Sequence, residues 1–308
     1  MSEHPPAVSP DDVERAAERI EPYVRRTPVL EYEGAVLKLE LLQHTGSFKP
    51  RGAFNRVLSE PSLPPAGVIA ASGGNHGAAI SFVGSRLGLP VEVFMPSTSP
   101  AIKRSAIERY GAVVSVVEGF YDDAQVAADE RQRVTGALMV HPFDHPATVA
   151  GQGTMGRELQ GQLDGFDTLV VACGGGGFIA GQAAWFEDRV RLVSVEPEAS
   201  QCLRAARQAG APVDVPVGGV AADSLGARRL GAVPWSVVRH YVDDAVVVGD
   251  EDIRAAQRAL WTDLRLLVEP GGAAAFAALA TGAYRPEPGE RVVVVVCGSN
   301  CDPATVIT

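Results

Sequence analysis

The chain has 308 residues, 46% hydrophobic and 21% charged, a composition that indicates a globular protein with a large core and excludes a disordered chain. Its formal net charge is −10 at pH 7 and no basic tract offsets it, which argues against nucleic acid or an anionic membrane as a partner. The N-terminus lacks the cationic and apolar regions of a signal peptide, and no apolar run predicts a membrane span, so we expect a cytoplasmic protein.

The first predicted element is an amphipathic helix over residues 10–26, capped by Ser9 and acidic in its first turn. Residues 27–30 are expected to break this helix, and residues 35–40 have the pattern of a strand.

A lysine, Lys49, follows in a Gly/Ser-rich turn, just before a helix predicted to begin at Ala53. The chain has only two other lysines, Lys38 and Lys103. Arginine never gives up its proton in a protein, whereas lysine becomes an amine nucleophile once desolvation or a neighbouring charge lowers its pKa. Lys49 is therefore the candidate for imine chemistry, although a solvated lysine on a surface turn explains this stretch alone equally well.

From residue 67 onward, short apolar strands alternate with helices, a pattern typical of parallel sheets covered by helices. The Pro/Gly-rich stretches 61–67 and 211–219 are interpreted as connections. The predicted strands are 67–71, 90–95, 112–117, 168–173, 191–195 and 291–297, and the predicted helices include one ending at Leu87 and those over 99–110 and 121–135.

Three glycine-rich turns follow three of these strands. Backbone N–H groups at a strand-to-helix turn, aided by the helix dipole, bind anions without a basic side chain. The run Gly174–Gly177 is the best phosphate candidate, because four glycines let the backbone wrap an anion closely. Tight strand–helix packing is the alternative, since the run fits neither the dinucleotide-binding pattern nor a nucleotide P-loop.

The second turn, residues 72–77, reads Ser-Gly-Gly-Asn-His-Gly and could hold a small carboxylate through its hydroxyl, amide and backbone N–H groups. Helix capping by Ser72 is an equally good explanation. The third, residues 296–300, ends the last strand, where open α/β sheets place their ligands. Glu269 precedes an alanine-rich helix and is read by itself as an acidic cap. The four cysteines lack zinc-site spacing and are interpreted as reduced thiols: Cys173, Cys202, Cys297 and Cys301.

The order of these motifs resembles the serine/threonine dehydratase and serine racemase group of fold-type II pyridoxal-phosphate (PLP) enzymes. The likeness extends over nearly the whole chain, from residue 24 to Asn300. It rests on Ser47-Phe48-Lys49-Pro50-Arg51-Gly52-Ala53, Ser72-Gly73-Gly74-Asn75-His76-Gly77, His141-Pro142-Phe143-Asp144, Gly151-Gln152-Gly153-Thr154, Gly174–Gly177, Val195-Glu196-Pro197-Glu198, Val268-Glu269-Pro270 and Cys297-Gly298-Ser299-Asn300.

The resemblance implies a role for individual residues. Lys49 would form the Schiff base with PLP and then act as the base at the substrate Cα, while Phe48 would pack against the pyridine ring. Asn75 would bind the ring hydroxyl, Cys297 would face the pyridine nitrogen, and Glu269 would belong to the cofactor-binding set. The cofactor phosphate would be bound by Gly174, Gly175, Gly176 and Gly177, and the substrate carboxylate by Ser72, Gly73, Asn75 and His76.

The implied fold is two parallel-sheet α/β domains with PLP between them, in a homodimer. The large domain would comprise residues 1–66 and 145–308, and the small domain, inserted within it, residues 67–144. Few residues follow Asn300, so we expect a catabolic type without the regulatory domain of biosynthetic threonine dehydratases.

One departure from the family pattern concerns metal. Relatives that need a divalent cation have an acidic residue six positions after the glutamate that Glu196 matches, and here that position is Cys202. A magnesium or calcium site needs oxygen ligands, so it is incomplete. A potassium ion held by Glu196 and backbone carbonyls, as in some dehydratases of this group, is the remaining expectation.

The predicted activity is deamination of L-threonine or L-serine, each a small β-hydroxy amino acid, to the 2-oxo acid and ammonia. The alternatives are a serine or other amino-acid racemase, a dehydratase of a bulkier substrate such as phenylserine or hydroxyaspartate, and a non-catalytic ligand-binding protein. Racemases of this group resemble one another in using a serine hydroxyl on the face opposite the lysine, where this chain has Gly73. We therefore expect little D-isomer, and more of it after Gly73→Ser.

Overall fold

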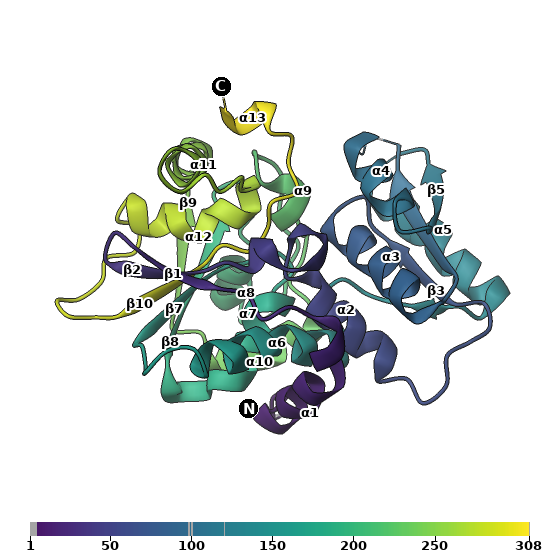
Figure 1. Ribbon diagram of the computed structural model, residues 1–308, viewed down its shortest axis with the longest axis horizontal. Helices are drawn as coiled ribbons and strands as arrows, with labels where there is room; N and C mark the ends of the chain where they lie inside the picture. Colours follow the sequence, from purple (N-terminus) through teal and green to yellow (C-terminus); the bar gives the residue numbers. More distant parts are fainter. Residues whose placement is uncertain (1–4, 98, 100, 120, 308) are drawn as a thin grey trace.

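The computed structural model describes residues 5–97, 99, 101–119 and 121–307, which form two sheets side by side (Figure 1). The larger sheet has the strand order β1-β2-β10-β7-β8-β9, and all its neighbouring strands are parallel except β1 and β2. The smaller sheet is parallel throughout, in the order β5-β4-β3-β6.

The strands of the larger sheet are β1 (Val29–Tyr32), β2 (Ala35–Lys38), β7 (Thr168–Ala172), β8 (Arg191–Pro197), β9 (Asp244–Val248) and β10 (Val292–Val295). Those of the smaller sheet are β3 (Val68–Ala71), β4 (Val91–Pro96), β5 (Val113–Val117) and β6 (Leu138–Met139). Strands β2, β3, β7 and β10 are buried along their whole length, as parallel sheets covered by helices require, whereas β5 at the edge of the smaller sheet is partly exposed.

The helices are α1 (Pro10–Ile20), α2 (Lys49–Leu58), α3 (Asn75–Leu87), α4 (Ala101–Glu108), α5 (Tyr121–Thr135), α6 (Pro146–Gln160), α7 (Gly177–Phe186), α8 (Cys202–Ala209), α9 (Ala222–Leu225), α10 (Ala232–Tyr241), α11 (Asp250–Leu264), α12 (Pro270–Ala280) and α13 (Ala304–Ile307). Short 3-10 turns lie at Glu21–Tyr23, Glu40–Leu42, His44–Gly46 and Glu187–Arg189. Helices α11 and α12 cover one side of the larger sheet, and α1, α6 and α10 lie on the other (Figure 1).

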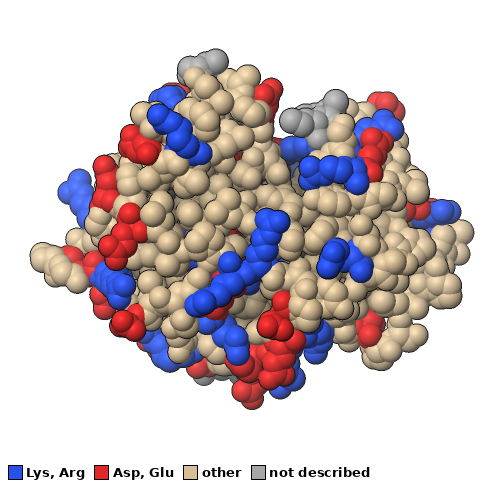
Figure 2. All heavy atoms as spheres, in the orientation of Figure 1, with Lys and Arg blue, Asp and Glu red and all other residues tan. Residues whose placement is uncertain are grey.

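The elements of the smaller sheet lie between residues 68 and 139, with strands of the larger sheet before and after them in the chain. This agrees with an inserted domain, whose boundaries at 67 and 144 stay a prediction. Within the described ranges, no helix has the length and apolar character needed to cross a bilayer. Uncharged residues make up most of the face shown in Figure 2, and basic and acidic side chains are both scattered over it.

Two predicted helix boundaries were wrong, and the strand β1 was not predicted. Helix α1 ends at Ile20 and not at residue 26, because Pro22 has no N–H to continue the hydrogen-bond ladder. Helix α2 begins at Lys49 and not at Ala53, since Pro50 fits the first turn of a helix. The expected break at 27–30 contains the start of β1, which pairs with β2 through a turn at Glu33 and Gly34, both with positive φ.

Candidate active site

Lys49 is the first residue of α2, and backbone contacts attach its stretch to the end of β10. The N–H of Phe48 donates to the carbonyl of Cys297 at 3.3 Å, and Ser47 forms an isolated bridge with Gly298. The amine Nζ of Lys49 donates to the carbonyl of Pro142 at 3.3 Å and lies 5.0 Å from the centre of the Phe48 ring. The lysine is thus held between elements of the larger sheet and the segment that follows the smaller one.

The environment of Lys49 prepares its amine for nucleophilic chemistry. Burial lowers the pKa of Lys49 to about 8, and the nearby Cys297 and Glu269 oppose this shift only in part. A substantial fraction of the amine is therefore unprotonated at mildly alkaline pH, which is the state that attacks a carbonyl.

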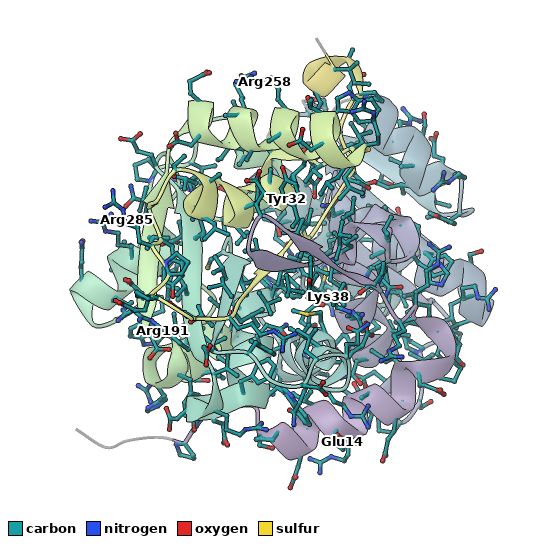
Figure 3. All side chains as sticks on the ribbon, turned by 60° about the vertical axis from the view of Figure 1, so that its left-hand side comes forward. Glu14, Tyr32, Lys38, Arg191, Arg258 and Arg285 are labelled. Carbon is teal, nitrogen blue, oxygen red and sulfur yellow. The ribbon has the colours of Figure 1, made fainter. Side chains whose placement is uncertain are left out.

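The other two lysines are engaged in ion pairs. Lys38 points from β2 into the interior (Figure 3) and donates to Glu158 at 2.5 Å and to the Gln162 side chain at 2.7 Å. Lys103, on α4, pairs with Asp223 on α9. Among the described residues, Lys49 has no carboxylate partner, so it is the one lysine available for reaction.

A buried ion cluster, Lys38–Glu40–Arg51–Glu158, lies behind the lysine and was not predicted. Arg51 donates to both oxygens of Glu40 at 2.8 Å and to Glu158 at 2.8 Å. Arg51, Glu40 and Lys38 are at most 1% exposed. Because Arg51 stands two residues after Lys49, the cluster fixes the first turn of α2.

The loop after β3, residues 72–75, meets the larger sheet through three amide and carboxylate groups. Asn75 donates to Glu269 Oε1 at 2.6 Å, and Asn300 donates to Asn75 Oδ1 at 2.8 Å and to the carbonyl of Thr45 at 2.7 Å. Burial raises the pKa of Glu269, while the bond from Asn75 and the charge of Lys103 counteract this. The structure therefore brings Asn75 and Glu269 together from different sheets, and adds Asn300.

The loop residues predicted to hold a carboxylate offer backbone groups more than side chains. The ring of His76 is buried, and its Nε2 lies 2.7 Å from the carbonyl of Val140. Burial, with the charge of Lys49, lowers the pKa of His76 to about 3, so the ring is neutral. The hydroxyl of Ser72 accepts the N–H of Gly74 at 3.2 Å. The first N–H groups of α3 have no carbonyl partner within the helix and are free to face an anion.

The run Gly174–Gly177 connects β7 to the start of α7 and has no room for side chains. An added Cβ would lie 2.5 Å from the Phe143 ring at Gly175 and 2.5 Å from Leu230 at Gly176, whose φ is +86°. The N–H groups at the start of α7 have no carbonyl partner within the helix. The loop is thus a backbone-only cradle at a helix N-terminus, which fits a phosphate group.

Two aromatic rings and a thiol complete this part of the site. Phe48 stacks on Phe178 with ring centres 3.9 Å apart and planes 15° from parallel. Phe178 belongs to the first turn of α7 and was not predicted as a site residue. Cys297 is 4% exposed, and burial raises the pKa of its thiol, which therefore stays neutral at physiological pH. An amine, a phosphate cradle and a neutral thiol together fit pyridoxal phosphate.

Glu196, the predicted cation ligand, lies near the end of β8, and its carboxylate meets the start of α8. Its two oxygens accept the N–H groups of Leu203 at 2.7 Å and Arg204 at 2.8 Å, and burial raises its pKa to about 7. Within the described ranges, no three His, Cys, Asp or Glu side chains form a group that could hold a metal ion. The carboxylate caps α8, and the potassium site stays a prediction.

The sequence matches the family described as pyridoxal-phosphate dependent enzyme over residues 20–298. It is 38% identical over 306 residues to an L-threonine ammonia-lyase of Geobacter sulfurreducens, covering 96% of this chain and 76% of the relative. It is 35% identical over 306 residues to the beta-hydroxyaspartate dehydratase of Paracoccus denitrificans, covering 95% and 96% of the two chains. The structure of maize serine racemase superposes with a TM-score of 0.91 at 31% identity, covering 98% and 96%.

These similarities extend over nearly the whole chain and agree with the site geometry. The predicted fold class, a fold-type II α/β architecture with parallel sheets, is confirmed. The chain belongs to the family of pyridoxal-phosphate dependent enzymes, among relatives that include ammonia-lyases and racemases.

Proposed function

We propose that the protein is an ammonia-lyase that deaminates L-threonine or L-serine to the corresponding 2-oxo acid and ammonia. The observation that carries this proposal is Lys49, whose amine has a pKa of about 8 and no carboxylate partner among the described residues, beside the loop that begins α3. A non-catalytic binding protein would need no such amine.

Each part of the site has a task in this reaction. When bound, the cofactor supplies the electron sink that makes the Cα–H bond of the amino acid acidic. The Lys49 amine removes that proton, and the N–H groups at the start of α3 orient the amino acid through its carboxylate. Cys297, whose buried thiol is neutral, would face the ring nitrogen of the cofactor and would not protonate it, which would favour loss of the β-hydroxyl.

Racemisation is the second candidate, because relatives of this chain include serine racemases. Gly73 has no side chain to donate a proton on the face opposite Lys49. General acid–base catalysis contributes a factor of roughly 10²–10⁴, so racemisation without such a group is expected to be slow beside elimination.

One assay separates these activities. The holoenzyme is incubated in potassium and in sodium buffer with L-threonine, L-serine, phenylserine and 3-hydroxyaspartate, and 2-oxo acid and D-isomer are measured. We expect L-threonine or L-serine to give the highest kcat/KM, with little D-isomer and a higher rate in potassium. D-serine forming as fast as pyruvate would contradict the lyase.

Lys49→Ala is the control for the chemistry. It is expected to lower kcat at least 10³-fold while the circular dichroism spectrum stays unchanged, because the amine is both nucleophile and base. Full activity in this variant would show that another group is the base. The expected homodimer is a further proposal, tested by light scattering on the purified protein, and the cytoplasmic location stays a prediction.

A further inference from the structure

The loops that follow β3 and β4 lie side by side at one edge of the smaller sheet. These strands are parallel neighbours, with Ala71 opposite Phe94, and the N–H of Ser72 donates to the carbonyl of Phe94 at 2.9 Å. The carboxyl ends of parallel strands form the edge at which open α/β sheets bind ligands. Residues after β4 can therefore contribute to the same site as the loop 72–75.

Ser99, in the loop after β4, stands in the space that a side chain at position 73 would need. A Cβ added to Gly73 would lie 2.1 Å from the Ser99 Oγ and 2.9 Å from its Cβ, distances that real side chains do not reach. The φ of Gly73 is not positive, so its backbone conformation is open to other residues. A side chain at position 73 therefore requires Ser99 to shift.

The Ser99 hydroxyl is a free donor in surroundings that suit an anion. It is partly buried, and it forms no hydrogen bond with any other residue that the structure describes. The N–H groups at the start of α3 lie in the adjacent loop, and the Lys103 Nζ, which pairs with Asp223, is 3.8 Å from the Cβ that Gly74 would carry. Ser97, two residues earlier, is exposed and donates to Glu118 instead.

We propose that Ser99 is a substrate-contacting residue whose hydroxyl donates a hydrogen bond to the carboxylate of the bound amino acid. In this role the Ser99 hydroxyl binds the carboxylate and takes no part in proton transfer at Cα, so the expectation of slow racemisation is unchanged. The role of Ser99 rests on the proposed function, which places the amino-acid carboxylate at the loop 72–75. It also means that Gly73→Ser alone has no room for its side chain.

The first test is Ser99→Ala in the holoenzyme, with Ser97→Ala as the matched control. A hydrogen bond to a charged group contributes favourably to the free energy of binding. Its loss is therefore expected to raise the KM for the amino acid about tenfold, with kcat changed less. The dissociation constant of L-alanine, which has the carboxylate but no β-hydroxyl to eliminate, is expected to rise by a similar factor in a visible-absorbance titration. Ser97→Ala is expected to change either constant less than twofold.

The second test is an exchange of the two residues. Gly73→Ser alone is expected to lower the melting temperature and raise the dissociation constant of L-alanine. The double variant G73S/S99G removes the obstructing atoms and is expected to recover both. Measured on protein freed of cofactor, the melting temperatures test the steric claim without catalysis.

The two proposals fail in different ways. A wild-type holoenzyme that binds L-alanine but deaminates no amino acid would contradict the proposed lyase activity. Binding of L-alanine to Ser99→Ala would still test the role of Ser99. Unchanged binding in Ser99→Ala, or a fully tolerated Gly73→Ser, would overturn the role of Ser99 whatever the reaction is.

Discussion

At the scale of single residues, burial lowers the pKa of the Lys49 amine. This favours its reaction but lowers the stability of the folded protein, because a charged amine is desolvated. Its pKa falls from 10.5 to about 8 on folding, so the unfolded chain binds the proton more tightly than the folded one. Between these two values the unfolded state holds more protons, and the free energy of unfolding therefore rises with pH. Below a pH of about 8 both states hold the proton, and the full destabilisation of the folded state by the buried charge is present.

We predict that Lys49→Met stabilises the cofactor-free protein at pH 7 by about 1–3 kcal/mol, because the desolvated charge is removed. The difference from wild type should shrink as the pH rises toward 10. Urea unfolding of both proteins at pH 7, 8.5 and 10 measures this difference in the free energy of unfolding. Groups that titrate alike in both proteins contribute equally to each and cancel in the difference. A variant less stable than wild type at pH 7 would show that the amine is not desolvated in the folded state.

At the scale of elements, helix α2 depends on the buried ion cluster Lys38–Glu40–Arg51–Glu158. Removing one member of a buried charge pair leaves the other uncompensated, which typically costs about 3–5 kcal/mol. The pair between Arg104 and Glu108 is exposed and is a suitable reference, since exposed pairs contribute about 0–1 kcal/mol.

We predict that Arg51→Met lowers the free energy of unfolding by about 3–5 kcal/mol and Arg104→Met by less than 1 kcal/mol. The double variant R51M/E40M should lose less of the free energy of unfolding than Arg51→Met alone, because the Glu40 carboxylate that Arg51→Met leaves unpaired is absent. Chemical denaturation gives these values. If both arginine variants lost the same small amount, the cluster would be irrelevant to the stability of α2.

Most of the elements could be predicted because their signals are local. Strands such as β10 are continuous runs of valine, and Ser9 with Asp12 caps α1 as its sequence indicates. Helices α6 and α12 are buried on nearly all sides, so their small residues show no amphipathic pattern, and α6 was not predicted. Strand β9 was also missed, since it is only partly buried at the edge of the sheet.

Within the site, residues in glycine-rich turns could be predicted and non-local contacts could not. Asn75 and Glu269 were expected as separate ligands, but their hydrogen bond joins positions 194 residues apart. The Ser99 hydroxyl was also missed, because its approach to Gly73 depends on two strands becoming neighbours. Phe178 could have been found, since it directly follows the glycine run and matches the aromatic Phe48.

At the scale of the whole molecule, two ion pairs connect the smaller sheet's helices to the segment 222–228. Lys103 pairs with Asp223, and Asp122 pairs with Arg228 at 3.0 Å. They differ in burial: the Lys103 side chain is 10% exposed, whereas Asp122 and Arg228 are 66% and 69% exposed. The first pair should therefore matter more for holding the loop 72–75 over Lys49.

We predict that Asp223→Ala raises the KM for the amino acid three- to tenfold, because the ion pair with Lys103 no longer holds the loop 72–75 in place. Asp122→Ala, the matched control, should change KM less than twofold. Steady-state kinetics at low and high salt measures both effects. Equal effects of the two variants would mean that the inner pair does not hold the loop.

Helix α2 packs against both halves of the molecule. Phe54 lies in one apolar cluster with Ile80 and Val83 of α3, while Gly52 is so close to α6 that an added Cβ would lie 2.7 Å from the Thr148 carbonyl. Helix α2 is therefore a junction between the two halves of the molecule. A shift of either half relative to this helix would change the surroundings of the reacting amine at its first residue.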